Sequence, residues 1–259
     1  MKRKTKIGIM ISGTGSNMME IVEKCWAGEI GAEVSFVGSD NPESKGLAWA
    51  KEKGIPTISV DFKQNKKMLV APIINFDLVL KMILNEHGDV VEKMEEQGFF
   101  KRFENGLRGY FYWKIGSEHM LLEEMANYDF DLLVLAGYMQ VCTPHFIESI
   151  NTMIGQWRIM NIHPALLPAF PGTDGYGDAW RYGVKVHGCT VHFIDTGIDT
   201  GPIIDQACYQ VSEEENFESF KKRGLAEEYI LYPRCIRLFT ENRLKVKKNE
   251  SGRQVVEIL

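Results

Sequence analysis

The sequence has no excess of positive charge, and this excludes one broad class of function. Its 30 Lys and Arg residues are outnumbered by 35 Asp and Glu residues, which gives a formal net charge of −5 and a pI near 5.8. Extensive binding to nucleic acid requires a basic surface that neutralises phosphates. We therefore expect no nucleic-acid partner, although a local pocket for a small anion is compatible with this charge.

Cysteine is scarce, and long apolar runs are lacking. The five cysteines are odd in number and include no CxxC pair, which argues against both a disulfide framework and a zinc site. We expect a reducing, cytoplasmic setting and no bound metal. No apolar run reaches the ~20 residues that a membrane-spanning helix needs, so no membrane role is expected.

The sequence does contain a regular alternation of apolar strands and helical stretches. Strands are predicted at residues 6–12, 34–38, 57–60 and 131–136, and helices at 18–26, at 42–53 and after Thr143, which would cap a helix with Pro144 at its first position. Two short strands are predicted at 243–246 and 255–259. This alternation is typical of βαβ units and predicts an α/β fold with a parallel sheet. At 259 residues with 44% hydrophobic content, the chain is long enough for one large domain of this class.

The alternation is lost between about residues 64 and 116. This stretch contains an apolar run at 72–84, an acidic helical pattern at 89–97 and an aromatic group at 110–113. It is too long for a simple loop, so we interpret it as an inserted helical segment. We expect its aromatic residues to pack against the parent domain, rather than to line a ligand site or a dimer contact.

A glycine-rich turn, Gly13-Thr14-Gly15, follows the first strand and precedes a helix that begins near Ser16 and Asn17. Glycine lets the backbone approach an anion, and the unpaired N–H groups at a helix start can bind it. The turn lacks the third glycine of a dinucleotide fingerprint and the lysine of a P-loop. A simple tight turn is therefore an equally good interpretation of this motif alone.

The most informative stretch is an apolar strand that carries Asn161 and His163 and ends at Pro164. Residues two positions apart lie on one face of a strand, so an amide and an imidazole are presented together. Asp199 follows in a glycine-containing loop after another predicted strand. The three groups together can bind an oxyanion and move protons. The alternative is structural, with Asn161 capping a turn, His163 buried in the core and Asp199 serving the turn.

Four motifs occur in an order that resembles the folate-dependent formyltransferases. They are the turn at 15–17, Leu-Ala-Gly-Tyr-Met at 135–139, the segment at 161–168 and the segment at 187–193 that leads to Asp199. Within that family, the chain resembles the branch that passes a formyl group from 10-formyltetrahydrofolate to glycinamide ribonucleotide in purine biosynthesis. The match covers about residues 5–62 and 117–245. It implies a single domain over 1–259, Rossmann-like, with a mostly parallel sheet of about seven strands and helices on both faces.

The resemblance also implies roles for individual residues. Asn161 and His163 would stabilise the oxyanion that forms when an amine attacks the formyl carbon, and Asp199 would assist proton transfer. The amine of the acceptor would meet Glu228. Its phosphate would be held by Gly15, Ser16 and Asn17. The folate would be bound by two segments, composed of Met139, Gln140, Val141 and Cys142, and of Asp195, Thr196, Gly197 and Ile198.

The sequence departs from the family at several positions. The loop at 173–178 stands where the family usually carries histidines, and Asp199-Thr200-Gly201 stands where Gly-Gly is usual. Gln140 and Leu225 replace longer or polar contacts, and the segment at 64–116 replaces a shorter one. Because the loop at 173–178 lies where the acceptor would be chosen, the main alternative is a formyltransferase that acts on another amine, such as a sugar nucleotide.

Proteins with different functions share the fold or its first turn. Methionyl-tRNA formyltransferase and formyltetrahydrofolate hydrolase normally carry a further domain, which this sequence does not display. A non-catalytic folate- or nucleotide-binding relative would keep the fold alone. A dinucleotide-dependent oxidoreductase would use Asp40, but the GxGxxG pattern is missing. The expected partners are small molecules, and a homodimer is compatible with the sequence.

Overall fold

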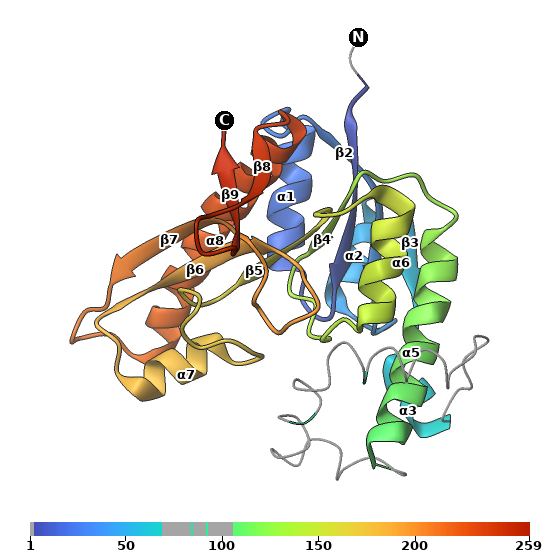
Figure 1. The fold of residues 1–259 in the computed structure, drawn as a ribbon, viewed down its shortest axis with the longest axis horizontal. Coiled ribbons are helices and arrows are strands. Elements are labelled where there is room, and N and C mark those ends of the chain that lie inside the picture. The colour runs from blue at the N-terminus through green and yellow to red at the C-terminus, as the bar shows by residue number, and fades with distance from the viewer. Residues whose placement is uncertain (1–2, 69–83, 85–91, 93–105) are drawn as a thin grey trace.

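The computed structural model describes residues 3–68, 84, 92 and 106–259 (Figure 1). The strands are β1 (Thr5–Ile11), β2 (Ala32–Ser39), β3 (Thr57–Ser59), β4 (Leu132–Leu135), β5 (Ile159–His163), β6 (Val186–Phe193), β7 (Ile203–Gln210), β8 (Leu244–Lys248) and β9 (Gln254–Ile258). The helices are α1 (Ser16–Trp26), α2 (Lys45–Glu52), α3 (Phe62–Met68), α5 (Gly106–Met125), α6 (Pro144–Ile154), α7 (Gly175–Tyr182) and α8 (Phe217–Thr240).

Seven strands form one sheet in the order β3-β2-β1-β4-β5-β6-β7. The pairs from β3 to β5 are parallel, whereas β6 is antiparallel to both β5 and β7. The expected α/β fold with a mostly parallel sheet of about seven strands is therefore confirmed. The strand order reverses direction at β1, where ligands bind in open sheets of this kind.

Strand alternation gives the sheet two apolar faces. Ile7 and Ile9 of β1 belong to a core formed with α1, α2 and α8, whereas Met10 belongs to a second core formed with α5 and α6. Figure 1 shows α5 and α6 on one side of the sheet and α1 on the other. The predicted arrangement with helices on both faces is confirmed.

The long helix α8 ties the middle of the sheet together. It begins at a capping box, in which the Asn216 side chain accepts from the Ser219 N–H and the Ser219 hydroxyl accepts from the Asn216 N–H. Tyr232 is fully buried, and its hydroxyl contacts the main-chain oxygens of Leu135 at 3.1 Å and Met160 at 2.8 Å. This contact fixes α8 against β4 and β5, the two strands that lead into the site.

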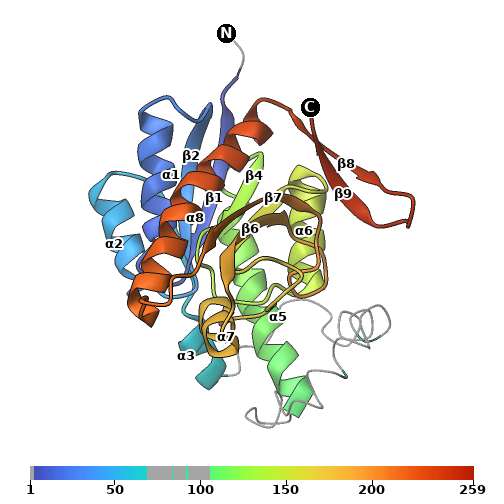
Figure 2. The same ribbon diagram turned by 90° about the vertical axis from the view of Figure 1, so that its left-hand side faces the viewer.

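The last two strands form a separate antiparallel hairpin, β8–β9, which projects from the body in Figure 2. The two short strands predicted at the end of the sequence are thus confirmed. The hairpin also reaches the rest of the molecule, because the Arg253 guanidinium donates to the main-chain oxygen of Thr200 at 3.3 Å.

Most of the segment interpreted as an insertion, 64–116, lies outside the described residues. Its described ends are the second half of α3 and the first half of α5, so the expected boundary at 116 falls inside a continuous helix. Tyr110, Phe111 and Trp113 are buried in the second core, and the Trp113 indole donates to the Phe62 carbonyl at 2.8 Å. The expectation that the aromatic group packs against the parent domain is confirmed for these three residues.

Across residues 3–68, 84, 92 and 106–259, no helix has the length and apolar character needed to cross a membrane. The five cysteines are all free thiols.

Candidate active site

β5 presents two polar side chains at the end of the sheet. Met160 and Ile162 face the first core, so Asn161 and His163, which alternate with them, face the opposite side. His163 is the last residue of the strand and is buried, with 3% of its surface exposed. The predicted pairing of an amide and an imidazole on one face is therefore present.

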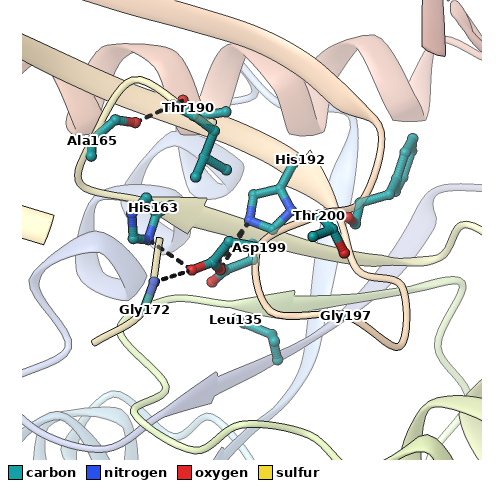
Figure 3. Close-up of polar contacts among 12 residues, drawn as sticks. Leu135, His163, Ala165, Gly172, Thr190, His192, Gly197, Asp199 and Thr200 are labelled. Atoms are coloured by element: carbon teal, nitrogen blue, oxygen red, sulfur yellow. Dashed lines mark hydrogen bonds and ion pairs between the residues drawn. The ribbon is translucent and has the colours of Figure 1, made fainter. Parts of the chain in front are cut away.

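Asp199 lies between two histidines (Figure 3). Its Oδ2 atom is 3.5 Å from His163 Nδ1, and its Oδ1 atom is 3.7 Å from His192 Nε2. The Gly172 N–H donates to Oδ2 at 2.7 Å. Asp199 has a φ of 54°, a left-handed conformation that aspartate adopts more readily than most residues. The loop after β6 thus returns the carboxylate to the end of β5, beside His163.

The second nitrogen of His163 is also engaged. Nε2 lies 2.7 Å from the main-chain oxygen of Phe170. A carbonyl oxygen can only accept, so Nε2 carries a proton, and Nδ1 carries one as well only when the ring is cationic. His163 therefore donates to Asp199 as an imidazolium, and as a neutral ring it offers Asp199 only a lone pair.

His192 belongs to this site, although it was not among the residues predicted from the sequence. It is fully buried and lies directly opposite Asn161 in the antiparallel β5–β6 ladder. Its Nδ1 is 2.9 Å from the Phe193 carbonyl, so Nδ1 holds the proton and Nε2 accepts from Asn161 Nδ2 at 3.2 Å. Burial lowers the pKa of His192 and so favours the neutral ring, whereas the Asp199 carboxylate opposes this shift. Alternation with Val191 and Phe193 was the sequence signal for its position.

Thr190, two residues before His192, holds the loop that follows β5. Its hydroxyl donates to the Ala165 oxygen at 2.7 Å (Figure 3) and accepts from the Leu167 N–H at 3.0 Å. Thr190 pairs with His163 across the strands. The β5–β6 ladder therefore fixes both the His163 imidazole and the loop that follows β5.

At the other end of the site, Glu228 of α8 is buried with 4% of its surface exposed. Asn17 Nδ2 donates to its Oε2 at 2.6 Å and the Tyr176 hydroxyl to its Oε1 at 2.5 Å. Burial raises the pKa of Glu228, and the two hydrogen bonds and the charge of Lys221 oppose that rise. No Lys or Arg among the described residues forms an ion pair with this carboxyl.

The glycine-rich turn leads into α1 as expected. Gly15 has a φ of 71° and serves as the N-cap, and no side chain caps the helix. The first N–H groups of α1 are therefore left to solvent or to a ligand. Asn17 is turned toward Glu228, and its own Oδ1 is buried without a partner among the described residues.

The stretch at 173–178, expected to be a loop, contains the N-cap and the first turn of α7 (Gly175–Tyr182), and two of its side chains determine the local structure. The Asp174 side chain caps α7 by accepting from the Gly177 N–H at 3.2 Å, and it pairs with Arg181 at 2.8 Å. Tyr176 points into the molecule and reaches Glu228. Tyr176 was not among the expected site residues, although it lies in the first turn of α7; its direction depends on where that helix begins, which the local pattern does not indicate.

The segment that connects β4 to α6 forms another wall. The peptide groups of Gln140, Val141 and Cys142 make no main-chain hydrogen bond within the described part of the chain. Met139 and Val141 have 57% and 37% of their surface exposed. Facing it, the loop after β6 is held by Asp195, whose Oδ1 accepts from the Gly197 N–H at 3.1 Å and the Thr200 hydroxyl at 2.7 Å.

One cavity of about 610 Å³ joins these parts. Its lining includes the expected residues of all four groups, with the exception of Thr196: Gly15, Ser16, Asn17, Met139, Gln140, Val141, Cys142, Asn161, His163, Asp195, Gly197, Ile198, Asp199 and Glu228. Lys221 is the only Lys or Arg among the described residues that line it. Within the same residues, no group of three His, Cys, Asp or Glu side chains is arranged to hold a metal ion.

Residues 5–236 match the family model described as Formyl transferase. The chain belongs to the formyl transferase family. Its full-length relatives in that family include the phosphoribosylglycinamide formyltransferase of Haemophilus influenzae, which is 30% identical over 246 residues and is matched over 94% of this chain and 91% of its own length.

Two further similar proteins extend the comparison. The crystal structure of glycinamide ribonucleotide transformylase 1 from Symbiobacterium toebii superposes with a TM-score of 0.74 at 32% identity, covering 100% of this chain and 96% of that one. The formyltetrahydrofolate deformylase of Bacillus subtilis is 37% identical, but over only 52% of this chain and 43% of its own length.

Proposed function

We propose that this formyl transferase moves the formyl group of 10-formyltetrahydrofolate to the amine of glycinamide ribonucleotide, a step of purine biosynthesis. The observation that carries the proposal is the convergence of Asn161, His163 and Asp199 in one cavity. The full-length similarity to phosphoribosylglycinamide formyltransferases supports the choice of donor and acceptor.

Asn161 is proposed to stabilise the oxyanion. The acceptor nitrogen forms a bond to the formyl carbon, and the electron pair of the C=O bond moves to the oxygen. Asn161 Nδ2 has two protons, of which one is donated to His192. The second is free to bind the oxyanion, and the hydrogen bond to His192 holds the amide in this orientation.

His163 and Asp199 are proposed to complete the charge and proton balance. As an imidazolium, His163 would donate to the same oxygen; its Nε2–H now contacts the Phe170 carbonyl, so the formyl oxygen must take that position. When the oxyanion collapses, the bond from carbon to the folate nitrogen breaks. The acceptor nitrogen loses one proton and the folate nitrogen gains one, and Asp199 assists this transfer.

The acceptor is proposed to bind between the first turn of α1 and α8. Its phosphate would meet the N–H groups at Gly15 and Ser16, with Lys221 contributing positive charge. Glu228 would receive the amine, because it is a buried carboxyl that lines the cavity and has no cationic partner of its own among the described residues. In this arrangement Asn17 acts on Glu228 rather than on the phosphate.

The folate is proposed to bind along the segment from Met139 to Cys142. Three successive residues whose peptide groups make no main-chain hydrogen bond to the described residues can bind the donors and acceptors of a pterin ring, and the exposed Met139 and Val141 side chains offer apolar contact. The loop from Asp195 to Ile198 would close the other side.

The test is turnover of 10-formyltetrahydrofolate by purified protein with and without glycinamide ribonucleotide, following both loss of the donor and formation of the formylated amine. We expect turnover that depends on the acceptor. Asn161→Ala should reduce kcat by about 10²–10³-fold, the usual cost of one oxyanion donor, and Asp199→Ala should also abolish most activity. Folate binding without turnover would contradict the proposed acceptor, and absence of folate binding would contradict the proposed donor.

A second acceptor class is favoured by one observation. Tyr176 occupies the floor of the acceptor pocket and donates to Glu228, in a loop that differs from the family pattern. An amino-sugar nucleotide, which also joins an amine to a phosphate, is the alternative acceptor. The same assay with such a nucleotide decides between them, because the true acceptor is the one with the higher kcat/KM.

A further inference from the structure

Lys114 of α5 is a buried cation outside the proposed catalytic groups. None of its surface is exposed, although lysine is almost never fully buried without a partner. Its Nζ forms an ion pair with Glu118 Oε1 at 3.3 Å and donates to Gln140 Oε1 at 3.2 Å, and it lies 4.9 Å from the centre of the Phe62 ring. The lysine thus joins a glutamate on its own helix to a residue of the cavity wall.

Glu118, one turn after Lys114, holds the far end of the same wall. It is also fully buried. Its Oε1 accepts from the Thr143 N–H at 3.1 Å, and its Oε2 accepts from the Thr143 hydroxyl. Thr143 in turn caps α6 by accepting from the Phe146 N–H. One face of α5 therefore fixes the wall at Gln140 and again at Thr143.

A third contact holds Gln140 from the opposite direction. Its Nε2 donates to Asp40 Oδ2 at 2.6 Å, just beyond the end of β2. The carboxamide is therefore held by a cation on its oxygen and by a carboxylate on its nitrogen, which fixes the orientation of both ends. The segment between Gly137 and Thr143 has no helix or strand of its own, so its shape depends on such contacts.

A buried ion pair is a costly way to stabilise a core, because apolar residues of similar volume usually do as well or better. The pair instead fixes the position of the segment 140–143, since Lys114 binds Gln140 at one end of it and Glu118 binds Thr143 at the other. We propose that Lys114 and Glu118 are positioning residues for the folate, which act by holding the segment 140–143 in the shape that binds it. This inference rests on the proposed function, because it takes that segment to be the folate-binding wall.

The test replaces the pair with apolar residues. Lys114→Met alone leaves Glu118 buried and unpaired and can unfold the protein, so the informative variant is Lys114→Met/Glu118→Leu, which keeps volume and removes both charges. The matched control is Asn65→Leu/Ser117→Ala. It removes another buried polar contact of α5, at 3.3 Å, that does not touch the wall.

Three quantities are measured for each protein: the Kd for tetrahydrofolate by calorimetry, kcat and both KM values, and Tm. We expect the charge-free variant to keep its Tm while the Kd for tetrahydrofolate and the KM for the formyl donor rise by about 10- to 100-fold, the range that misplacement of about 1 Å produces. The acceptor KM and the kcat at saturating donor should stay close to wild type. The control should keep wild-type values throughout.

Wild-type folate affinity in a charge-free variant with unchanged Tm would overturn the inference and leave the proposed function intact. Equal losses of donor and acceptor binding would also overturn it, because they would indicate a general structural role. Absence of tetrahydrofolate binding by the wild-type protein would overturn the proposed function, and the inference with it.

Discussion

Two glutamates are buried in or near the cavity, and they differ in their partners. Glu118 lies behind the wall at 140–143 and pairs with Lys114. Glu228 lies in the cavity lining and receives hydrogen bonds from Asn17 and Tyr176, which are neutral. Burial raises the pKa of both carboxyls, but only Glu118 has a nearby lysine that is itself buried.

The difference distinguishes a carboxylate whose charge is compensated within the fold from one that is proposed to contact a ligand. The charge of Glu118 is compensated within the fold, so it can hold Thr143 whether or not a substrate is bound. The charge of Glu228 is not compensated by a close cation among the described residues. In the proposed function, a substrate amine that donates a hydrogen bond to Glu228 would supply part of that compensation.

The largest expected effect is the loss of stability when Lys114, the cation paired with Glu118, is removed. Lys114→Met should lower the free energy of unfolding by about 3–5 kcal/mol, because it leaves Glu118 as an isolated buried charge. Urea unfolding at neutral pH measures this change. Glu228→Gln, which removes a charge that has no close cation, should change stability by only about 1 kcal/mol. Equal losses in the two variants would remove the distinction between the glutamates.

The next effect concerns acceptor binding. Glu228→Gln should lower kcat/KM for glycinamide ribonucleotide by about 10- to 100-fold, since a hydrogen bond to a charged group contributes roughly 1.5–3 kcal/mol. The Kd for tetrahydrofolate should not change, because Glu228 lies at the other end of the cavity. Steady-state kinetics and calorimetry together check both statements, and a loss confined to folate binding would contradict the assignment of Glu228.

The pH dependence sharpens the same comparison. Burial raises the pKa of Glu228 above its ordinary value of 4.5, so the acid limb of kcat/KM for the acceptor should have its midpoint above 4.5. Glu228→Gln should lose this limb. The free energy of unfolding depends on pH in the opposite direction to acceptor activity. Because the pKa of Glu228 is raised in the folded state, its contribution to stability is full below pH 4.5 and is lost as pH rises through the folded pKa. Urea unfolding across that range should show a shallower decline in Glu228→Gln.

The smallest expected effect comes from Tyr176. Its hydroxyl favours the charged form of Glu228, so Tyr176→Phe should move the acid limb to higher pH by about 0.5–1 unit, equivalent to one hydrogen bond of roughly 1 kcal/mol. The measurement is the pH profile of kcat/KM for the acceptor. A shift to lower pH would show that Tyr176 does not stabilise the carboxylate.

The sequence predicted the fold well because periodicity carries most of that information. The runs at 6–12 and 131–136 became β1 and β4, and Thr143 with Pro144 predicted the start of α6. The predicted helix at 42–53 begins only at Lys45, since the side chain of Asn41 first accepts from the Glu43 N–H in a turn. The antiparallel direction of β6 could not be read from its apolar pattern, which is the same in both directions.

The candidate site was predictable where a strand presents it and less so where a loop does. Asn161 and His163 follow from the alternation of β5, and His192 could have been found by the same argument applied to β6. Tyr176 and Lys114 could not. Tyr176 lies in the first turn of α7, and a single turn gives no period from which its direction can be predicted. Lys114 is a lysine whose complete burial depends on partners 4 and 26 positions away.

The hydrogen bond between Asn17 and Glu228 joins residues that are 211 positions apart. During synthesis, the ribosome therefore makes β1, the glycine turn and most of the sheet long before α8 can supply the carboxyl. Until then the amide of Asn17 has no partner and the acceptor end of the cavity lacks its floor. Asn17 therefore gains its partner, and the proposed acceptor end of the cavity its carboxyl, only once α8 has been made and has docked onto β4 and β5.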